Sequence, residues 1–161
     1  MPSTASTTDK NLNPGDEIDL DVTGVAHGGV FVARYGATDD SPGRVVFVAD
    51  TLPGERVRAR LPDTGHAAFW RADTVAVLDA APERQAHVWA AADTAVAPEN
   101  RPGGAEFGHI KLAYQRELKS QVISDALKRI GKLDLPVSVA AASDESEDGT
   151  RWRTRVSLHV D

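Results

Sequence analysis

The chain has 161 residues, of which 41% are hydrophobic and 26% charged, a balance typical of one ordinary globular domain or two small ones. It contains no cysteine, which excludes disulfides, thiolate-held iron–sulfur clusters, cysteine-type zinc sites and a cysteine nucleophile within this chain. The net charge of −6 argues against a protein that coats nucleic acid evenly, so any RNA binding requires locally clustered cations.

The N-terminal segment does not have the pattern of a secretory signal. Residues 1–15 begin with a stretch rich in serine and threonine that lacks the apolar core of a secretory signal, so we expect a disordered tail there. The longest apolar runs, such as Val45–Ala49, are far shorter than the ~20 residues that span a bilayer. We therefore expect a cytoplasmic protein with no membrane partner.

Residues 16–80 have the pattern of a small all-β domain. Ile18, Leu20 and Val22 alternate with acidic residues, as in a half-buried strand. Four more stretches of β character follow, separated by turns rich in glycine, proline and aspartate: Val30–Tyr35, Arg44–Ala49, Arg56–Leu61 and Phe69–Leu78. A sandwich usually needs about seven strands. Five strands without a helix predict a closed or partly closed barrel of the oligonucleotide-binding (OB) type.

The second half of the chain changes character. Residues 81–110 are rich in proline and glycine and predict an irregular connection. Lys111–Lys132 has apolar residues at four-residue spacing from Tyr114 to Ile130, which predicts a helix with that stripe in the core. Beyond it we expect a strand over Leu135–Ala141, a solvated acidic loop over Ser143–Gly149 and a strand over Trp152–Val160. The predicted fold class is mainly β, with the five-stranded barrel followed by the start of an α+β domain over 111–161, cut off as in a fragment.

Three motifs occur in a characteristic order. The first is the hairpin around His27-Gly28-Gly29, and the second is Val46-Phe47-Val48 followed by the Leu52-Pro53-Gly54-Glu55 turn. The third combines Gly103-Gly104-Ala105, His109-Ile110, Tyr114-Gln115 and Leu118-Lys119. Together with the basic stretch Arg153–Val156, these motifs resemble the S-adenosylmethionine-dependent RNA uridine-5-methyltransferases that carry an N-terminal TRAM domain, especially versions from high-GC bacteria.

The resemblance implies a function and also marks two departures from it. Cluster-binding members of the family place cysteines where this chain has Pro102 and Ala105, so we expect no iron–sulfur cluster, and any ordering role must be met by packing. The family attacks uracil C6 with a cysteine thiolate, and this chain has neither a cysteine nor a glycine-rich nucleotide site. We therefore expect no catalytic residue and no cofactor in this chain. It would hold ribosomal or transfer RNA, as a monomer, for a catalytic domain that binds S-adenosylmethionine.

The candidate RNA contacts are basic and aromatic residues on the predicted strands and helix. Arg56, Arg58 and Arg60 alternate, so their guanidinium groups would share one face and could follow a phosphate backbone, although outward charges on a barrel are often simply solvated. Tyr35 is the favoured stacking aromatic, whereas Phe47 is expected in the core. The full set is Arg34, Tyr35, Arg44, Arg56, Arg58, Arg60, Lys119, Arg153 and Arg155. The five histidines have no metal-ligand spacing, so no metal is expected.

Two other functions fit the same residues. The chain could be a free-standing, non-enzymatic RNA-binding or chaperone protein of the TRAM type. Alternatively, the barrel could position a neighbouring domain without touching nucleic acid, which the acidic net charge allows. Salt-dependent RNA binding separates the last of these from the other two.

Overall fold

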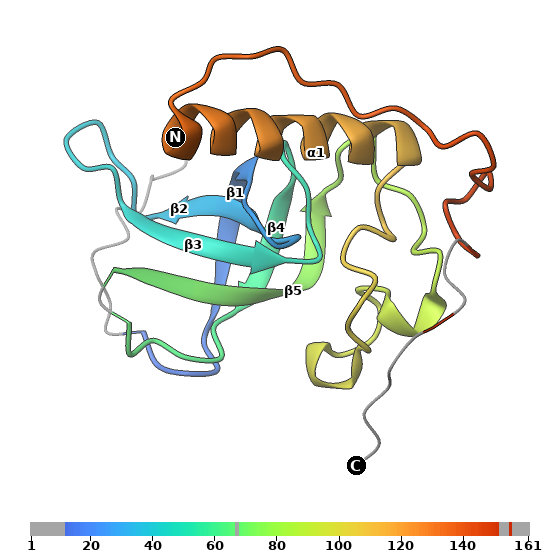
Figure 1. Cartoon of the computed structure of the whole chain (residues 1–161). Helices are drawn as coiled ribbons and strands as arrows, with labels where there is room; N and C mark the ends of the chain where they lie inside the picture. The colour runs from blue at the N-terminus through green and yellow to red at the C-terminus, as the bar shows by residue number, and fades with distance from the viewer. Residues whose placement is uncertain (1–11, 67, 152–154, 156–161) are drawn as a thin grey trace.

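The computed structural model describes residues 12–66, 68–151 and 155, and it contains a closed barrel of five strands (Figure 1). The strands are β1 (Glu17–Val25), β2 (Phe31–Tyr35), β3 (Arg44–Ala49), β4 (Arg56–Arg60) and β5 (Phe69–Asp79). Their order around the barrel is β1-β2-β3-β5-β4. Only β3 and β5 run parallel, and the other pairs are antiparallel. The predicted OB-like barrel is confirmed.

Alternation along each strand fills the barrel. On β1, Ile18, Leu20 and Val22 are buried while the acidic residues between them are exposed. Because β1 pairs with β4 and closes the barrel, Ile18 lies opposite Ala59 and Leu20 opposite Val57. The other fully buried side chains of the core include Phe31, Val46, Val48, Leu52 and Leu61. Closure removes the unpaired edges that an open sheet of this size would present.

One aromatic expectation is wrong. Phe47 was expected in the core, but the inward positions of β3 are those of Val46 and Val48, so Phe47 points outward and is only partly buried. Phe31 is the fully buried phenylalanine instead. The apolar run of β3 hid this alternation, because valine and phenylalanine occupy both of its faces.

The segment between the barrel and the helix is irregular, as predicted. It contains two short 3₁₀ turns, η1 (Ala90–Ala92) and η2 (Pro98–Asn100). Its two ends are nevertheless joined to each other: Arg84 and Ile110 form an isolated β-bridge, and the Lys111 N–H donates to the Glu83 carbonyl. We call residues 81–110 the connector.

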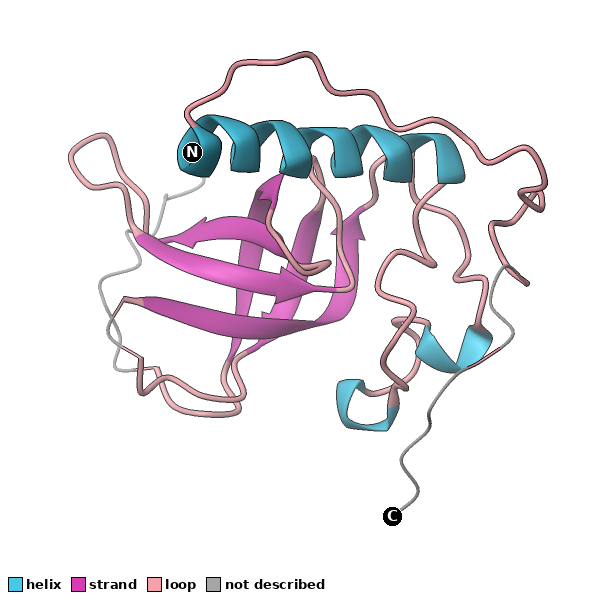
Figure 2. Cartoon of the chain, viewed as in Figure 1, coloured by secondary structure: helices cyan, strands magenta, loops and turns pink. Residues whose placement is uncertain are grey.

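Helix α1 (Leu112–Ala126) continues into the π-helical turn η3 (Leu127–Gly131), and both lie across one end of the barrel (Figure 2). The predicted helix bounds are therefore confirmed to within one residue. The predicted core stripe is only half correct. Leu118 is fully buried, but Ile123 is 44% and Ile130 84% exposed.

The region after the helix forms no strand in the part of the chain that the structure describes. Residues 135–141 run as an irregular segment along α1, and Val139 N–H donates to the Ser120 hydroxyl rather than to a neighbouring strand. The strand expected over Trp152–Val160, and most of the tail expected over 1–15, lie outside the described residues. No described helix has the length and apolar character that a membrane span requires.

Candidate nucleic-acid interface

The arginine row of β4 faces an acidic row on β1. Across the β1–β4 pairing, Glu17 lies opposite Arg60, Asp19 opposite Arg58 and Asp21 opposite Arg56. The three arginines do share an outer face as predicted, but three carboxylates lie directly beside them. The row is therefore a ladder of opposite charges rather than a positive track.

Direct contacts within this ladder engage two of the arginines. Arg58 Nε and Nη2 donate to the two carboxylate oxygens of Asp19 at 2.8 and 3.1 Å, and this hydrogen bonding lowers the pKa of Asp19. Arg60 lies 3.8 Å from the Glu17 carboxylate and 3.4 Å from that of Glu99 in the connector. A phosphate would have to compete with these partners for the guanidinium groups.

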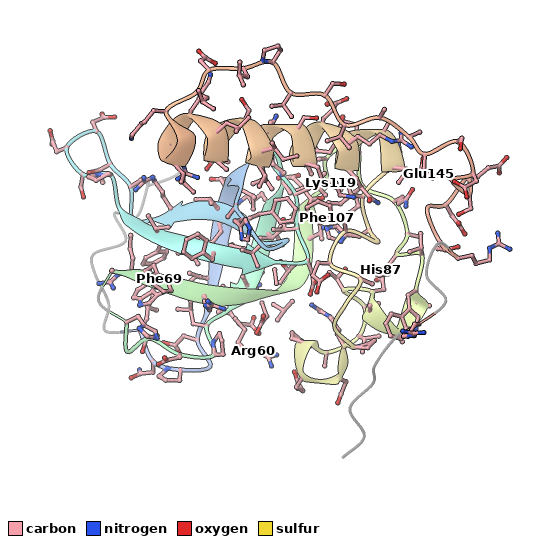
Figure 3. The ribbon with its side chains drawn as sticks, viewed as in Figure 1. Arg60, Phe69, His87, Phe107, Lys119 and Glu145 are labelled. Atoms are coloured by element: carbon pink, nitrogen blue, oxygen red, sulfur yellow. The ribbon has the colours of Figure 1, made fainter. Side chains whose placement is uncertain are left out.

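A second outer face, formed by β2, β3 and β5, combines aromatic rings with cations. Pairing places Val32 beside Phe47 and Phe47 beside Arg71, while Arg34 lies beside Val45 and Val45 beside Phe69. We call Arg34, Phe47, His66, Phe69 and Arg71 the aromatic face. Figure 3 labels Phe69 at its outer edge.

The rings of the aromatic face form one cluster. Phe47 and Phe69 meet edge to face with centroids 5.4 Å apart and an interplanar angle of 71°. His66 stacks on Phe69 at 5.4 Å and 6°. On this face Arg34 and Arg71 are exposed, and Arg71 forms no salt bridge with the described residues. His66 is exposed and the two phenylalanines are partly exposed, and an aromatic cluster of this kind between arginines is suited to stacking unpaired bases while contacting their phosphates.

Two predicted residues lie beneath this face. Tyr35 is partly buried and packs against the core, its ring lies 5.7 Å from that of Trp70, and it belongs to the opposite face of β2 from Arg34. The Arg44 guanidinium lies 4.4 Å from the Trp70 ring centroid, and its Nη1 donates to the His66 carbonyl at 3.0 Å. Arg44 therefore supports the loop that carries His66.

The remaining predicted contacts lie elsewhere. Lys119 is exposed on α1, beside a separate groove between the helix and the connector. Arg155 is exposed, and Arg153 lies outside the described residues.

Sequence reasoning missed three residues of the aromatic face, namely His66, Phe69 and Arg71. Alternation in Phe69-Trp70-Arg71-Ala72 was a usable signal, since Trp70 and Ala72 are buried and the residues between them point outward. The sequence pattern does not show that β3 and β5 pair in parallel, and this pairing places Phe69 near Phe47.

A buried ion pair attaches the connector to the barrel. Glu55, from the Pro53-Gly54-Glu55 turn, is 1% exposed, and its carboxylate accepts hydrogen bonds from the Thr51 hydroxyl at 2.9 Å and from Arg84 Nε and Nη2 at 2.5 and 2.8 Å. Burial alone would raise the pKa of Glu55, but the hydrogen bonds and the charge of Arg84 outweigh it and lower that pKa. Glu55 is thus anionic at neutral pH and fixes the start of the connector.

Hydrogen bonds order the part of the connector near Pro102 and Ala105, the two positions that match the cysteines of cluster-binding relatives. Arg101, next to Pro102, donates to the carbonyls of Val96 and Thr94 and, at 2.8 Å, to the carboxylate of Asp50. His109 Nε2 donates to the Thr51 carbonyl at 2.8 Å, and burial lowers the pKa of His109 to about 4, so this ring is neutral at pH 7. Among the described residues there is no group of three potential metal-ligating side chains.

The two arginine sets can be separated by a matched pair of double variants. Arg34→Gln/Arg71→Gln and Arg56→Gln/Arg58→Gln each remove two positive charges, so the net charge changes equally. We expect the first to weaken binding of unpaired RNA roughly tenfold or more and the second by less than about threefold, because the β4 arginines face carboxylates. Fluorescence anisotropy at constant salt measures both. Equal losses of RNA affinity in the two variants would show that the arginines of β4 also contact RNA.

Comparisons with known proteins agree with one another: the domain match and the relatives both indicate RNA methyltransferases with a TRAM domain. Residues 12–64 match the model of the TRAM domain. The chain is 37% identical over 156 residues to an RNA methyltransferase of Streptomyces coelicolor. The aligned region covers 91% of this chain and 32% of that relative. It is 35% identical over 147 residues to the 23S rRNA (uracil(1939)-C(5))-methyltransferase RlmD of Halomonas elongata, covering 89% of this chain and 26% of that protein. The chain thus spans about a quarter to a third of the length of these relatives.

Proposed function

Since this chain belongs to the family of TRAM-domain RNA (uracil-5-)methyltransferases, we propose that it is the segment that holds RNA for methylation of a uridine at C5. The observation that carries the proposal is the partly exposed cluster of Phe47, Phe69 and His66 between Arg34 and Arg71. Catalysis and S-adenosylmethionine binding are assigned to a part of the enzyme outside these 161 residues, because the chain has no cysteine to attack uracil C6.

We further propose that the RNA is ribosomal. Two relatives, from Halomonas elongata and Xanthomonas oryzae, are named as methyltransferases of 23S rRNA, which favours ribosomal over transfer RNA as the substrate. In this proposal the barrel occupies residues 16–80, the connector 81–110 and the start of a further domain 111–161. The protein acts in the cytoplasm, and one copy binds one RNA.

The aromatic face explains how an acidic protein binds RNA. Bases stack on the rings regardless of sequence, and each stacked base contributes about 1–3 kcal/mol. Arg34 and Arg71 flank the rings and meet the phosphates between those bases, so the positive charge is placed where the strand runs. Duplex RNA presents no unstacked bases, and the proposal therefore requires unpaired RNA.

A titration at two salt concentrations tests the proposal. Anisotropy of a labelled single-stranded ribosomal RNA fragment should report micromolar binding at 50 mM salt, with a duplex of equal length as the control. With two or three phosphate contacts, raising the salt to 200 mM should weaken binding about 7- to 18-fold, because counterion release scales with the number of phosphates neutralised. Absence of binding at 50 mM salt would leave the barrel with a structural role only.

A further inference from the structure

A groove lies between the barrel, the connector and α1, separate from the aromatic face. It encloses about 890 Å³, within the range of small-ligand sites. The loop 27–29 between β1 and β2 forms one side, Trp89 and Phe107 of the connector another, and Lys119 and Ile123 of α1 a third. Figure 3 shows Phe107 and Lys119 close together on this side of the molecule. We call it the connector groove.

Buried hydrogen bonds hold the walls of the connector groove in place. His87 is 8% exposed, and its Nδ1 accepts from the Trp89 N–H at 2.9 Å. Its Nε2 therefore carries the proton and donates to the Ala105 carbonyl at 3.1 Å, so one side chain joins two stretches of the connector wall. Gln115 Nε2 donates to the carbonyls of Phe107 and Ile110 at 3.0 and 2.9 Å, which attaches the helix to the same segment.

Glycines give the groove its shape. A Cβ on Gly108 would lie 2.3 Å from the His87 ring, so only glycine allows the ring to pass behind this wall. Gly28 and Gly104, both at positive φ, have open space where a side chain would be. The groove is thus a preformed hollow whose rim lets a flat group approach the backbone closely, and preorganisation of this kind lowers the cost of binding.

The lining combines an apolar surface with two cations. Trp89 and Ile123 are each 44% exposed although both are large apolar side chains. Lys119 and Arg151 lie at the rim and form no salt bridge with the described residues. Two carboxylates also lie there, but that of Glu106 accepts from the Gly104 N–H and that of Asp148 from its own turn at Thr150. With charges balanced, the interior suits a neutral aromatic group whose anionic neighbours meet Lys119 and Arg151 outside it.

We propose that the connector groove binds one unpaired nucleobase of the RNA strand held by the aromatic face. The base lies against the Trp89 indole, and its flanking phosphates contact Lys119 and Arg151. The loop 27–29 that borders the groove runs into β2, whose outward residues Val32 and Arg34 pair with β3 of the aromatic face, so β2 connects the border of the groove to that face. In this proposal the RNA strand follows β2 from one site to the other. This inference rests on the proposed function and adds a second base-binding site to it.

Abasic scanning of a single-stranded RNA tests the groove. A set of otherwise identical oligonucleotides carries one abasic nucleotide at successive positions, and each is titrated against the whole chain and against Trp89→Ala. For the intact chain, each position stacked on the aromatic face and one further position should cost about 5- to 150-fold in affinity, the range for loss of one stacked base, and the further position is the one assigned to the groove. Trp89→Ala should bind the intact oligonucleotide weaker by the same factor and show no further loss at that abasic position.

A matched pair of isoleucines controls for general effects of truncation. Ile123→Ala alters the groove, whereas Ile130→Ala removes the same side chain from the same helical segment outside it, and only the first should weaken binding. Thermal unfolding of each variant verifies that the fold is retained. Unchanged affinity in Trp89→Ala, with loss in Phe47→Ala/Phe69→Ala, would overturn the groove and leave the proposed function standing. A loss in Trp89→Ala that is equal for intact and abasic RNA would also overturn it, and absence of RNA binding by the unaltered chain would instead refute the proposed function.

Discussion

Replacing Glu55 with alanine is expected to lower the free energy of unfolding by about 3–5 kcal/mol, because it leaves Arg84 charged and largely buried without its partner. The Glu55 side chain is 0% and the Arg84 side chain 14% exposed, and the two are joined by two hydrogen bonds. Glu55 also accepts from the N–H groups of Leu52 and Ala81, so several donors lose their acceptor together.

Urea unfolding of single and double variants measures this effect. Arg84→Ala should cost a similar amount, and Glu55→Ala/Arg84→Ala should cost at least about 1.5 kcal/mol less than the sum of the two, since contacting residues are coupled. Glu99→Ala is the matched control: its carboxylate also pairs with an arginine but is 62% exposed, so its loss should be below about 1 kcal/mol. Additive losses at Glu55 and Arg84 would contradict the assigned role.

The pH dependence follows from the direction of the pKa shift. The pKa of Glu55 in the folded chain lies below its ordinary value of 4.5, so the ion pair contributes its full stability above pH 4.5 and loses it as the pH falls through the lower, folded pKa. Glu55→Ala should therefore lose stability less steeply than the unaltered chain below pH 4.5. Attachment of the connector depends on the same ion pair. The backbone amides around Trp89 should therefore lose protection from hydrogen exchange in this variant.

Replacing Phe47 and Phe69 together with alanine is expected to weaken binding of unpaired RNA at least 30-fold. Two stacked bases contribute about 2–6 kcal/mol together, and this range begins near a 30-fold change in affinity. The stability of the fold should change far less than for a core phenylalanine, because Phe47 and Phe69 are partly exposed on the outside of the barrel whereas Phe31 is fully buried. Anisotropy titration and thermal unfolding of the same preparation separate the two effects.

The matched control keeps the apolar area and removes the flat ring. Phe47→Leu/Phe69→Leu should bind RNA almost as weakly as the alanine variant if stacking is the interaction, and almost as tightly as the unaltered chain if only hydrophobic contact matters. Leu78→Ala, an exposed apolar position near the end of β5, should leave affinity unchanged. Unaltered RNA affinity in both phenylalanine variants would show that RNA does not bind at the aromatic face.

The five barrel strands, the helix and the inward face of most strands could be predicted from the sequence alone, whereas the strand expected over 135–141 was not found. The alternation of Ile18, Leu20 and Val22, and of Val57, Ala59 and Leu61, predicts which side chains fill a barrel, because a strand has a two-residue period and one apolar face. Helix bounds followed from spacing in the same way. These properties are local, so a window of a few residues contains them.

Only the tertiary structure decided which elements meet. Closure of the barrel brings Asp19 to Arg58, 39 residues apart, and turns an expected positive track into a ladder of opposite charges. The β3–β5 pairing brings Phe69 to Phe47 and creates the aromatic face. Glu55 pairs with Arg84, which follows it by 29 residues in the sequence. Alternation says whether a side chain points in or out, but it carries no information on which distant strand lies beside it, and the electrostatics of a surface depend on that neighbour.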